Sequence, residues 1–257
     1  MPEHKKIWDD FWKATNLSLS YDRAILRQEF ASIRWKKIEN NILDKYGSFK
    51  GLRVIEVGSG RGEISSLMAI KGARVSLLDY SSIALERART LFKNLGLDAD
   101  FIIADAMNVP KELLGKFDIS MSFGLAEHFT YPQRKTIFQV HRDLLNNRGS
   151  SFVEVPNKYC LPYIIFKKLA QFLGYWSVGL EIPFSRSELK KNAILTGFKN
   201  YEVVGSSFLR DSVYFLFARF ISHLTRRKII VDTSSFEIAS IFDNYLGRSL
   251  VLIGSKT

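Results

Sequence analysis

The hydrophobic pattern between residues 51 and 156 alternates short apolar runs with longer amphipathic segments. The apolar runs have six or seven residues each and predict strands that are buried on both faces. They are 52–57, 73–79, 100–105, 117–123 and 150–155. Segments of helical periodicity lie between them and end at glycine or asparagine. This alternation predicts an α/β fold with a doubly wound, mostly parallel sheet.

The segments on either side of this alternation extend the predicted fold. Residues 5–46 are expected to form two helices with aromatic and aliphatic contacts. Strands are predicted at 198–208 and 249–256, separated by an apolar insert, and we expect them to pair antiparallel at the edge of the sheet. The predicted fold class is therefore a Rossmann-like sheet of about seven strands with an antiparallel last strand.

The composition indicates a globular protein of a reducing compartment. Hydrophobic residues make up 46% of the 257 residues and charged residues 25%, which is enough to bury a core. The single cysteine, Cys160, excludes a disulfide framework and a CxxC metal site, and so predicts a cytoplasmic location. Residues 1–13 contain no apolar signal-peptide region, and Arg219 interrupts the most apolar window, 212–224.

The positive charge of the chain is concentrated in its flanks. Residues 51–156 contain 13 Lys and Arg against 12 Asp and Glu, so these residues contribute only +1 to the net charge of +11. Basic flanks around a nearly neutral core are typical of a contact with something anionic, or of a solvated surface without a partner.

The most informative stretch is "VIEVGSGRGE", residues 54–63. A dinucleotide fingerprint GxGxxG would place its third glycine at position 63, where this chain has Glu63, and the glycine stands at 62 instead. The strand also contains a carboxylate, Glu56, which disfavours a pyrophosphate at the following helix. A nicotinamide-dependent oxidoreductase and an ordinary strand–helix turn stay open as alternatives at this point.

"EVGSGRG" (56–62) resembles motif I of the class I S-adenosylmethionine-dependent methyltransferases. "LLDYS" (77–81), "ADAM" (104–107) and "FDISMSFGLAEHF" (117–129) resemble the later motifs of that family. The likeness is weaker over 181–203, and it says little about 1–50 or 207–248.

The resemblance implies a set of contacts with S-adenosylmethionine and its product S-adenosylhomocysteine, and no metal. Asp79 would accept hydrogen bonds from both ribose hydroxyls, and Asp105 would accept one from the adenine amino group. Tyr80 and Met107 would sandwich the adenine. The implied cofactor contacts are Glu56, Gly58, Ser59, Gly60, Gly62, Asp79, Tyr80, Asp105, Ala106, Met107, Phe123 and Gly124.

The predicted catalytic residues are Glu127 and His128, which follow the fourth predicted strand, 117–123. His128 is the candidate general base, because a histidine titrates in the working range; a purely structural histidine is the alternative. The sequence "SFGLAE" does not match the Asn/Asp-Pro-Pro-Tyr/Phe element expected for an amino group of a nucleic-acid base. Cys160 follows the fifth strand, which is the wrong place for a nucleophile in pyrimidine methylation.

The resemblance divides the chain into an N-terminal helical lid (1–50) and a methyltransferase domain (51–257). Within the domain we expect a cofactor-binding core (51–156), an acceptor-side and insert region (157–248) and the last strand (249–256). Trp8, Trp12, Tyr21 or Arg34 of the lid would lie near the acceptor. These boundaries and lid residues are expectations from sequence alone.

The aromatic and basic stretches 157–176 and 208–228 favour a small-molecule, lipid or lipid-linked acceptor. They also favour peripheral contact with an anionic membrane, and dimerisation and plain core packing are the other interpretations. The predicted function is methyl transfer to oxygen, nitrogen or carbon of such an acceptor. An RNA methyltransferase, with RNA as partner, and a non-catalytic protein that binds the cofactor or its product are the alternatives.

Overall fold

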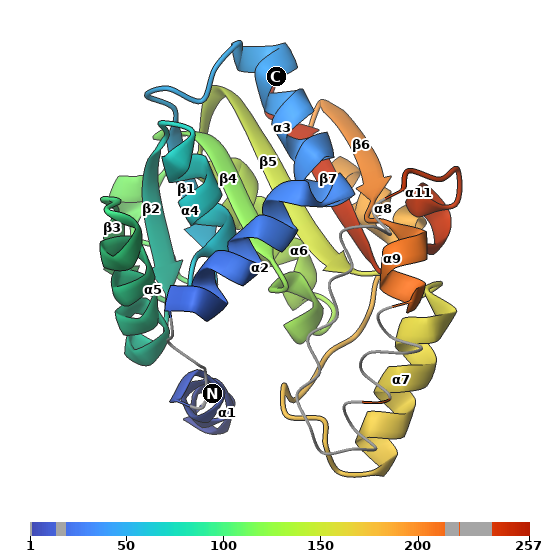
Figure 1. Ribbon diagram of the computed structural model, residues 1–257. Coiled ribbons are helices and arrows are strands. Elements are labelled where there is room, and N and C mark those ends of the chain that lie inside the picture. The colour runs from blue at the N-terminus through green and yellow to red at the C-terminus, as the bar shows by residue number, and fades with distance from the viewer. Residues whose placement is uncertain (1, 14–18, 214–220, 222–237) are drawn as a thin grey trace.

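A seven-stranded sheet with helices on both faces organises the computed structural model of the protein, which describes residues 2–13, 19–213, 221 and 238–257 (Figure 1). The strands overlap the predicted apolar runs: β4 has the predicted bounds, β5 begins at Leu145 rather than at 150, and β6 is shorter than the predicted 198–208. They are β1 (Arg53–Val57), β2 (Arg74–Asp79), β3 (Asp100–Ile103), β4 (Phe117–Phe123), β5 (Leu145–Pro156), β6 (Asn200–Gly205) and β7 (Ser249–Ser255).

The order of the strands in the sheet is β3-β2-β1-β4-β5-β7-β6. Strands β1 to β5 run parallel to one another, whereas β7 is antiparallel to both β5 and β6. The predicted Rossmann-like class and the antiparallel pairing of the last two strands are confirmed. β7 lies between β5 and β6, so β6 rather than the last strand of the chain forms the edge.

Helices cover both faces of the sheet. The helices of the described residues are α1 (Pro2–Lys13), α2 (Leu19–Ala31), α3 (Ile33–Tyr46), α4 (Glu63–Ile70), α5 (Ser82–Leu95), α6 (Gln133–Leu144), α7 (Leu161–Phe172), α8 (Arg186–Leu195), α9 (Phe208–Val213) and α11 (Asp243–Leu246), with 3₁₀ turns η1 (Lys111–Leu113) and η2 (Ala126–His128). α9 covers only the start of the apolar stretch predicted at 208–228, and residues 214–220 and 222–228 of that stretch lie outside the described residues.

The prediction of two helices for residues 5–46 is wrong, because this segment forms α1, α2 and α3. The break between α2 and α3 is made by Ser32, which has the extended conformation of a helix N-cap (φ −66°, ψ 143°). Its Oγ accepts a hydrogen bond from Trp35 N at 3.0 Å. A capping serine satisfies one of the unpaired N–H groups of a new helix and so starts α3 directly after α2 ends.

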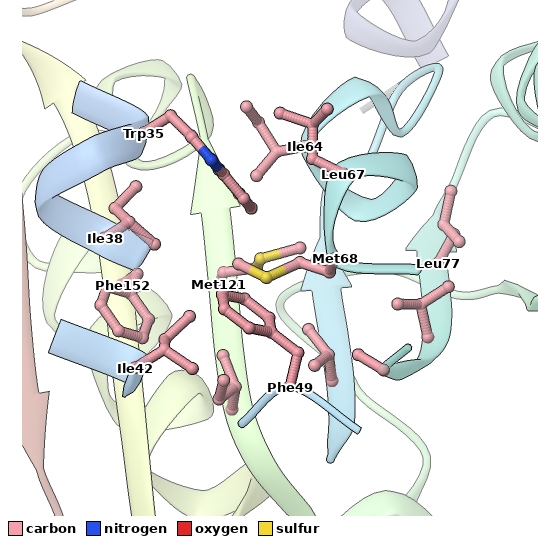
Figure 2. Close-up of a cluster of buried hydrophobic side chains, with 14 of the residues drawn as sticks. Trp35, Ile38, Ile42, Phe49, Ile64, Leu67, Met68, Leu77, Met121 and Phe152 are labelled. Carbon is pink, nitrogen blue, oxygen red and sulfur yellow. The ribbon is translucent and has the colours of Figure 1, made fainter. Parts of the chain in front are cut away.

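One face of the sheet is packed by α3, α4 and α5. Figure 2 shows side chains of α3 and α4 meeting side chains of β4 and β5 over this face. Trp35, Ile38 and Ile42 of α3 have no exposed surface, so this helix is part of the main core. The boundary predicted at residue 50 stays a prediction.

The other face is packed by α6 and α8. Ile137 and Phe138 of α6 and Leu189 of α8 are fully buried against β4, β5 and β7. Because the central strands are covered on both faces, their sequences are apolar at nearly every position, as expected for a buried parallel sheet. The parallel strands therefore place their carboxyl ends along one edge, where an open α/β sheet binds ligands.

Candidate active site

The glycine turn after β1 presents backbone rather than side chains at this edge. Gly58 and Gly60 have φ values of 64° and 53°, a conformation that glycine adopts without strain. A Cβ on Gly58 would lie 2.7 Å from Leu125 Cδ1, and one on Gly60 would lie 2.5 Å from Trp12 Cζ2. The turn therefore has no room for side chains at these two positions.

The two other predicted residues of the turn have different surroundings. Ser59 lines the cavity at the sheet edge, and its Oγ is buried without a hydrogen-bond partner. Such an orphaned hydroxyl suits a polar ligand in the cavity. Gly62 does not line the cavity: it precedes α4, and a Cβ there would lie 2.2 Å from Leu77 Cδ2. Gly62 therefore allows α4 to pack closely against β2.

Glu56 of β1 holds the start of α4. Its Oε2 accepts hydrogen bonds from Ser65 Oγ at 2.5 Å and from Ser65 N at 3.2 Å. Burial raises the pKa of Glu56 to about 8, although the bonds to Ser65 act in the opposite direction. The carboxyl group thus fixes the helix that follows the glycine turn and also lines the cavity.

Asp79, the last residue of β2, connects two loops of the site. Its Oδ2 accepts a hydrogen bond from Gly60 N at 2.9 Å and its Oδ1 accepts one from Ser81 N at 2.8 Å. Burial raises the pKa of Asp79, and these N–H donors oppose the shift. Because each carboxylate oxygen can accept a second hydrogen bond, Asp79 can still receive a ligand hydroxyl.

The loop after β3 lines the same cavity. Asp105 is exposed, and its Oδ1 accepts a hydrogen bond from Met107 N at 2.8 Å. Ala106 is buried, and Tyr80 from the neighbouring loop is half-buried. All four residues line the cavity, as the predicted adenine contacts require.

His128 lies in η2, just after β4 and the cavity-lining residues Phe123 and Gly124. Its Nδ1 is 2.6 Å from the carbonyl oxygen of Leu180, a distance that fixes Nδ1 as the protonated nitrogen of the neutral ring. The lone pair is then on Nε2. The Trp8 ring meets the imidazole edge to face, with 5.0 Å between the ring centroids.

Glu127 is buried beside His128 and carries an unsatisfied oxygen. Its Oε1 lies 4.0 Å from His128 Nε2, and its Oε2 has no hydrogen-bond partner. Burial raises the pKa of Glu127 well above its ordinary value, and the nearby carboxylates Glu181 and Glu154 add to the shift. A polar group of a ligand is therefore expected to bond to this carboxyl group.

These residues surround one cavity of about 980 Å³, which is near the upper end for small-molecule sites, roughly 300–1,000 Å³. Of the predicted site residues, all but Gly62 line it. Trp8, Trp12 and Arg34 line it as well, whereas the side chain of Tyr21 lies outside the described residues.

Helix α1 covers the cavity with aromatic side chains. Trp8, Phe11 and Trp12 all line it. The helix is held to the loop after β2 by Ser81 Oγ, which donates to Asp9 Oδ1 at 2.5 Å. The N-cap of α5 and the covering helix thus share one serine.

Sequence reasoning placed Arg34 near the acceptor but missed the charged groups that it contacts. Arg34 donates to Glu154 Oε1 at 2.5 Å and also to Glu29. Arg34 holds the pKa of Glu154 below its ordinary value, although burial opposes this. Arg248 and Glu181 line the same side. Arg34 and Glu154 are 120 positions apart in the chain, so local sequence patterns contain no signal for this contact.

Comparison with known proteins identifies the domain. Residues 54–149 match the family described as "Methyltransferase domain". The chain contains a class I S-adenosylmethionine-dependent methyltransferase domain. Ubiquinone biosynthesis O-methyltransferases are among its relatives: those of Azotobacter vinelandii and Chromobacterium violaceum are 25% and 24% identical over 52% and 49% of this chain. The alignments span 56% and 53% of those two proteins, so the chain matches about half of their length.

Solved structures share the fold of this methyltransferase domain. Magnesium protoporphyrin IX methyltransferase of Synechocystis PCC 6803, with bound S-adenosylhomocysteine, has a TM-score of 0.59 at 14% identity, covering 98% of this chain and 94% of that one. A possible histamine N-methyltransferase of Thermotoga maritima has a TM-score of 0.59 at 17% identity, covering 99% and 100%. The [4+2]-cyclase SpnF has a TM-score of 0.55 at 16% identity, covering 85% and 79%.

The residues present fit S-adenosylmethionine. The glycine turn presents backbone to the cavity, Ser59 Oγ is buried without a hydrogen-bond partner, and Asp79 accepts a hydrogen bond from Gly60 N. Among the described residues, no group of three or more His, Cys, Asp or Glu is placed to hold a metal ion.

The substitution Glu56→Gln is expected to change how stability depends on pH. Folded Glu56 keeps its proton up to pH about 8, against an ordinary value of 4.5. The unfolded chain releases the proton first, so the wild-type protein loses stability as pH rises through this window, and the amide variant does not. In urea titrations at pH 5, 6.5 and 8, the free energy of unfolding of the variant should therefore rise relative to that of wild type as pH rises. The control Glu112→Gln, at an exposed site, should show no such gain, and a pH-independent difference for Glu56→Gln would contradict the assignment.

The substitution Asp79→Ala is expected to weaken S-adenosylmethionine binding by about 1.5–3 kcal/mol, the scale of hydrogen bonds to a charged group. The variant loses the predicted ribose acceptor and the bond that holds Gly60 N. Calorimetric titration measures the loss, and Asp98→Ala, at an exposed site beyond α5, is the control. Unchanged affinity would mean that another residue binds the ribose.

Proposed function

We propose that this protein transfers a methyl group from S-adenosylmethionine to a hydroxyl group of an apolar small molecule or lipid. The observation that carries the proposal is a single cavity with the predicted cofactor residues on one side and Glu127 and His128 on the other. A cavity of about 980 Å³ has room for a second molecule beside a cofactor.

When bound, S-adenosylmethionine would supply the methyl group of its sulfonium, and the sulfur would keep both electrons of the broken carbon–sulfur bond. The protein has to align the acceptor, exclude water and remove one proton. The aromatic side chains of α1 are proposed to exclude water, because Trp8 contacts His128 and Trp12 lies against the glycine turn.

His128 is proposed as the general base. Leu180 O fixes the tautomer, so that Nε2 takes the proton of the acceptor hydroxyl while the oxygen forms its bond to the methyl carbon. Burial raises the pKa of Glu127 well above its ordinary value, and Glu127 is proposed to orient the acceptor rather than to remove its proton.

An oxygen acceptor is favoured by the relatives, which are O-methyltransferases of ubiquinone biosynthesis. The cavity also receives Phe11, Val178 and Leu180, which suit an apolar body attached to the hydroxyl. A cytoplasmic location, inferred from the single cysteine, belongs to this proposal.

One assay series separates this proposal from an RNA methyltransferase and from a non-catalytic binding protein. Titration with S-adenosylmethionine and with NADH tests the cofactor. Labelled methyl transfer to lipid extract and to RNA tests the acceptor. The proposal expects binding of the first cofactor only and label in lipid. Label in RNA would favour the basic flanks as an RNA surface, and binding without transfer would indicate a non-catalytic protein.

The substitution His128→Ala is expected to lower turnover about 10²-fold or more, the usual contribution of a general base, while cofactor affinity stays nearly unchanged. Single-turnover rates with labelled cofactor and calorimetry measure the two quantities. His128→Gln keeps the size of the side chain without its basicity and should behave alike. Lys135→Ala, exposed on α6, is the control. Normal turnover in both His128 variants would make the histidine structural.

We further propose that α7 brings the acceptor side of the cavity to an anionic membrane. One face of α7 is exposed and apolar, and the opposite face, with Tyr163 and Ala170, is buried. The exposed apolar side chains are Leu161, Ile165, Leu169, Phe172 and Leu173. Figure 1 shows α7 on the side of the sheet where β4 and β5 end.

Charge and position support a membrane as the partner of α7. Residues 157–180 contain no acidic residue, and Lys158 and Lys168 are exposed, whereas Lys167 is buried and paired with Glu181; exposed lysines beside an apolar face are typical of a helix that lies on anionic lipid. The loop after α7 carries Val178 and Leu180, which line the cavity, so an apolar acceptor has a short route into it. No helix of the described residues is long and apolar enough to cross a membrane.

The substitution Phe172→Glu is expected to reduce binding to vesicles at least about tenfold, because it removes a large apolar side chain from the contact and adds a repelled charge. Flotation with vesicles of phosphatidylcholine containing phosphatidylglycerol measures this. Gln171→Glu makes the same change in charge beside it without loss of apolar surface and should have the smaller effect. Equal binding of wild type and Phe172→Glu would exclude α7 as the contact.

A further inference from the structure

Helix α2 is tied to the glycine turn by a buried ion pair. Asp22, in its first turn, pairs with Arg61, which stands between Gly60 and Gly62. Both side chains are only 2% exposed. The Arg61 guanidinium also lies 3.5 Å from Glu63 at the start of α4. The turn that faces the cofactor side of the cavity is therefore held from beneath by another helix.

The other end of α2 is tied to the opposite side of the cavity. Glu29, in its last turn, pairs with Arg34, and Arg34 pairs with Glu154 at the end of β5. Glu29, Arg34 and Glu154 all line the cavity. Figure 1 shows α2 running across one face of the sheet between α5 and α3. One helix thus reaches both sides of the site.

These ion pairs constrain the turn because buried charges are tolerated only when they are paired. A movement of the glycine turn that carried Arg61 away would leave Asp22 buried and uncompensated. The conformation that places Gly60 N on Asp79 is therefore the one that keeps α2 in place. A ligand that binds this conformation of the turn also stabilises α2.

We propose that Asp22 and Arg61 are positioning residues that couple cofactor binding at the glycine turn to the order of α2 and, through Arg34, to the acceptor side of the cavity. The coupling rests on the proposed function, because S-adenosylmethionine is the ligand of the turn. Binding on one side of the cavity then favours binding on the other, and by linkage the effect is reciprocal.

The test compares wild type and Asp22→Asn in the full chain, with S-adenosylhomocysteine as the probe. In wild type the probe should slow amide hydrogen exchange in residues 58–66 and also in 22–34. In Asp22→Asn the Kd of the probe should rise by about 5- to 150-fold, the usual range of coupling between sites. The slowing should persist in 58–66 and be lost in 22–34, which a merely structural ion pair would not produce.

Two further variants make the result decisive. Glu39→Gln removes an ion pair with Lys71 between α3 and the end of α4, away from the cavity, and should leave Kd and exchange pattern unchanged. Arg61→Lys keeps the charge without the planar fork, and it replaces Asp22→Asn as the test if that variant is unfolded in a thermal scan.

Equal Kd and equal protection of 22–34 in wild type and variant would overturn the coupling while leaving the proposed function intact. Absence of probe binding in wild type would overturn both. The two failures are therefore distinguishable in the same titration.

Discussion

Burial of carboxylates at the carboxyl ends of the strands is the constraint on which the site depends. Glu56, Asp79 and Glu154 are 3%, 5% and 6% exposed, and such groups need hydrogen bonds or opposite charges. Glu56 is satisfied by the start of α4, Asp79 by the N–H groups of two loops, and Glu154 by Arg34 of α3. Each carboxylate thus fixes a different segment around the cavity, and together they define its walls.

The sheet and the cofactor side of the site could be predicted because their signals are local. A parallel strand that is buried on both faces is a nearly continuous apolar run, so β1, β2 and β4 could be predicted from the sequence alone. The tight turn after β1 requires glycine at positive φ, and the strand-end position of Asp79 follows from the strand itself. Gly62 shows the limit of this reasoning: the motif contains it, but its place is in helix packing and not in the cavity wall.

The contacts that fix the acceptor-side residues could not be predicted in this way, because distant segments form them. The contact of His128 with Leu180 and that of Arg34 with Glu154 join residues whose separation is set by tertiary packing. A lone arginine or glutamate has no periodicity that would reveal its partner. The break between α2 and α3 could in principle be predicted, since Ser32 is a good N-cap residue. The N–H that Ser32 caps is that of Trp35, whose burial in the core is a tertiary feature.

The electrostatics of the cavity explain why a basic protein has an acidic site. The net charge is +11, yet the cavity is lined by eight carboxyl groups against Lys5, Arg34 and Arg248. The carboxyl groups are those of Glu29, Glu56, Glu63, Asp79, Asp105, Glu127, Glu154 and Glu181. Burial raises the pKa of several of them, including Glu56 and Asp79, because a low-dielectric site disfavours the ionised form. A pyrophosphate would add negative charge beside these buried groups, whereas a sulfonium with an ammonium group can pair with the carboxylates that stay ionised. The carboxyl-rich lining therefore favours the same class of cofactor as the sequence motif.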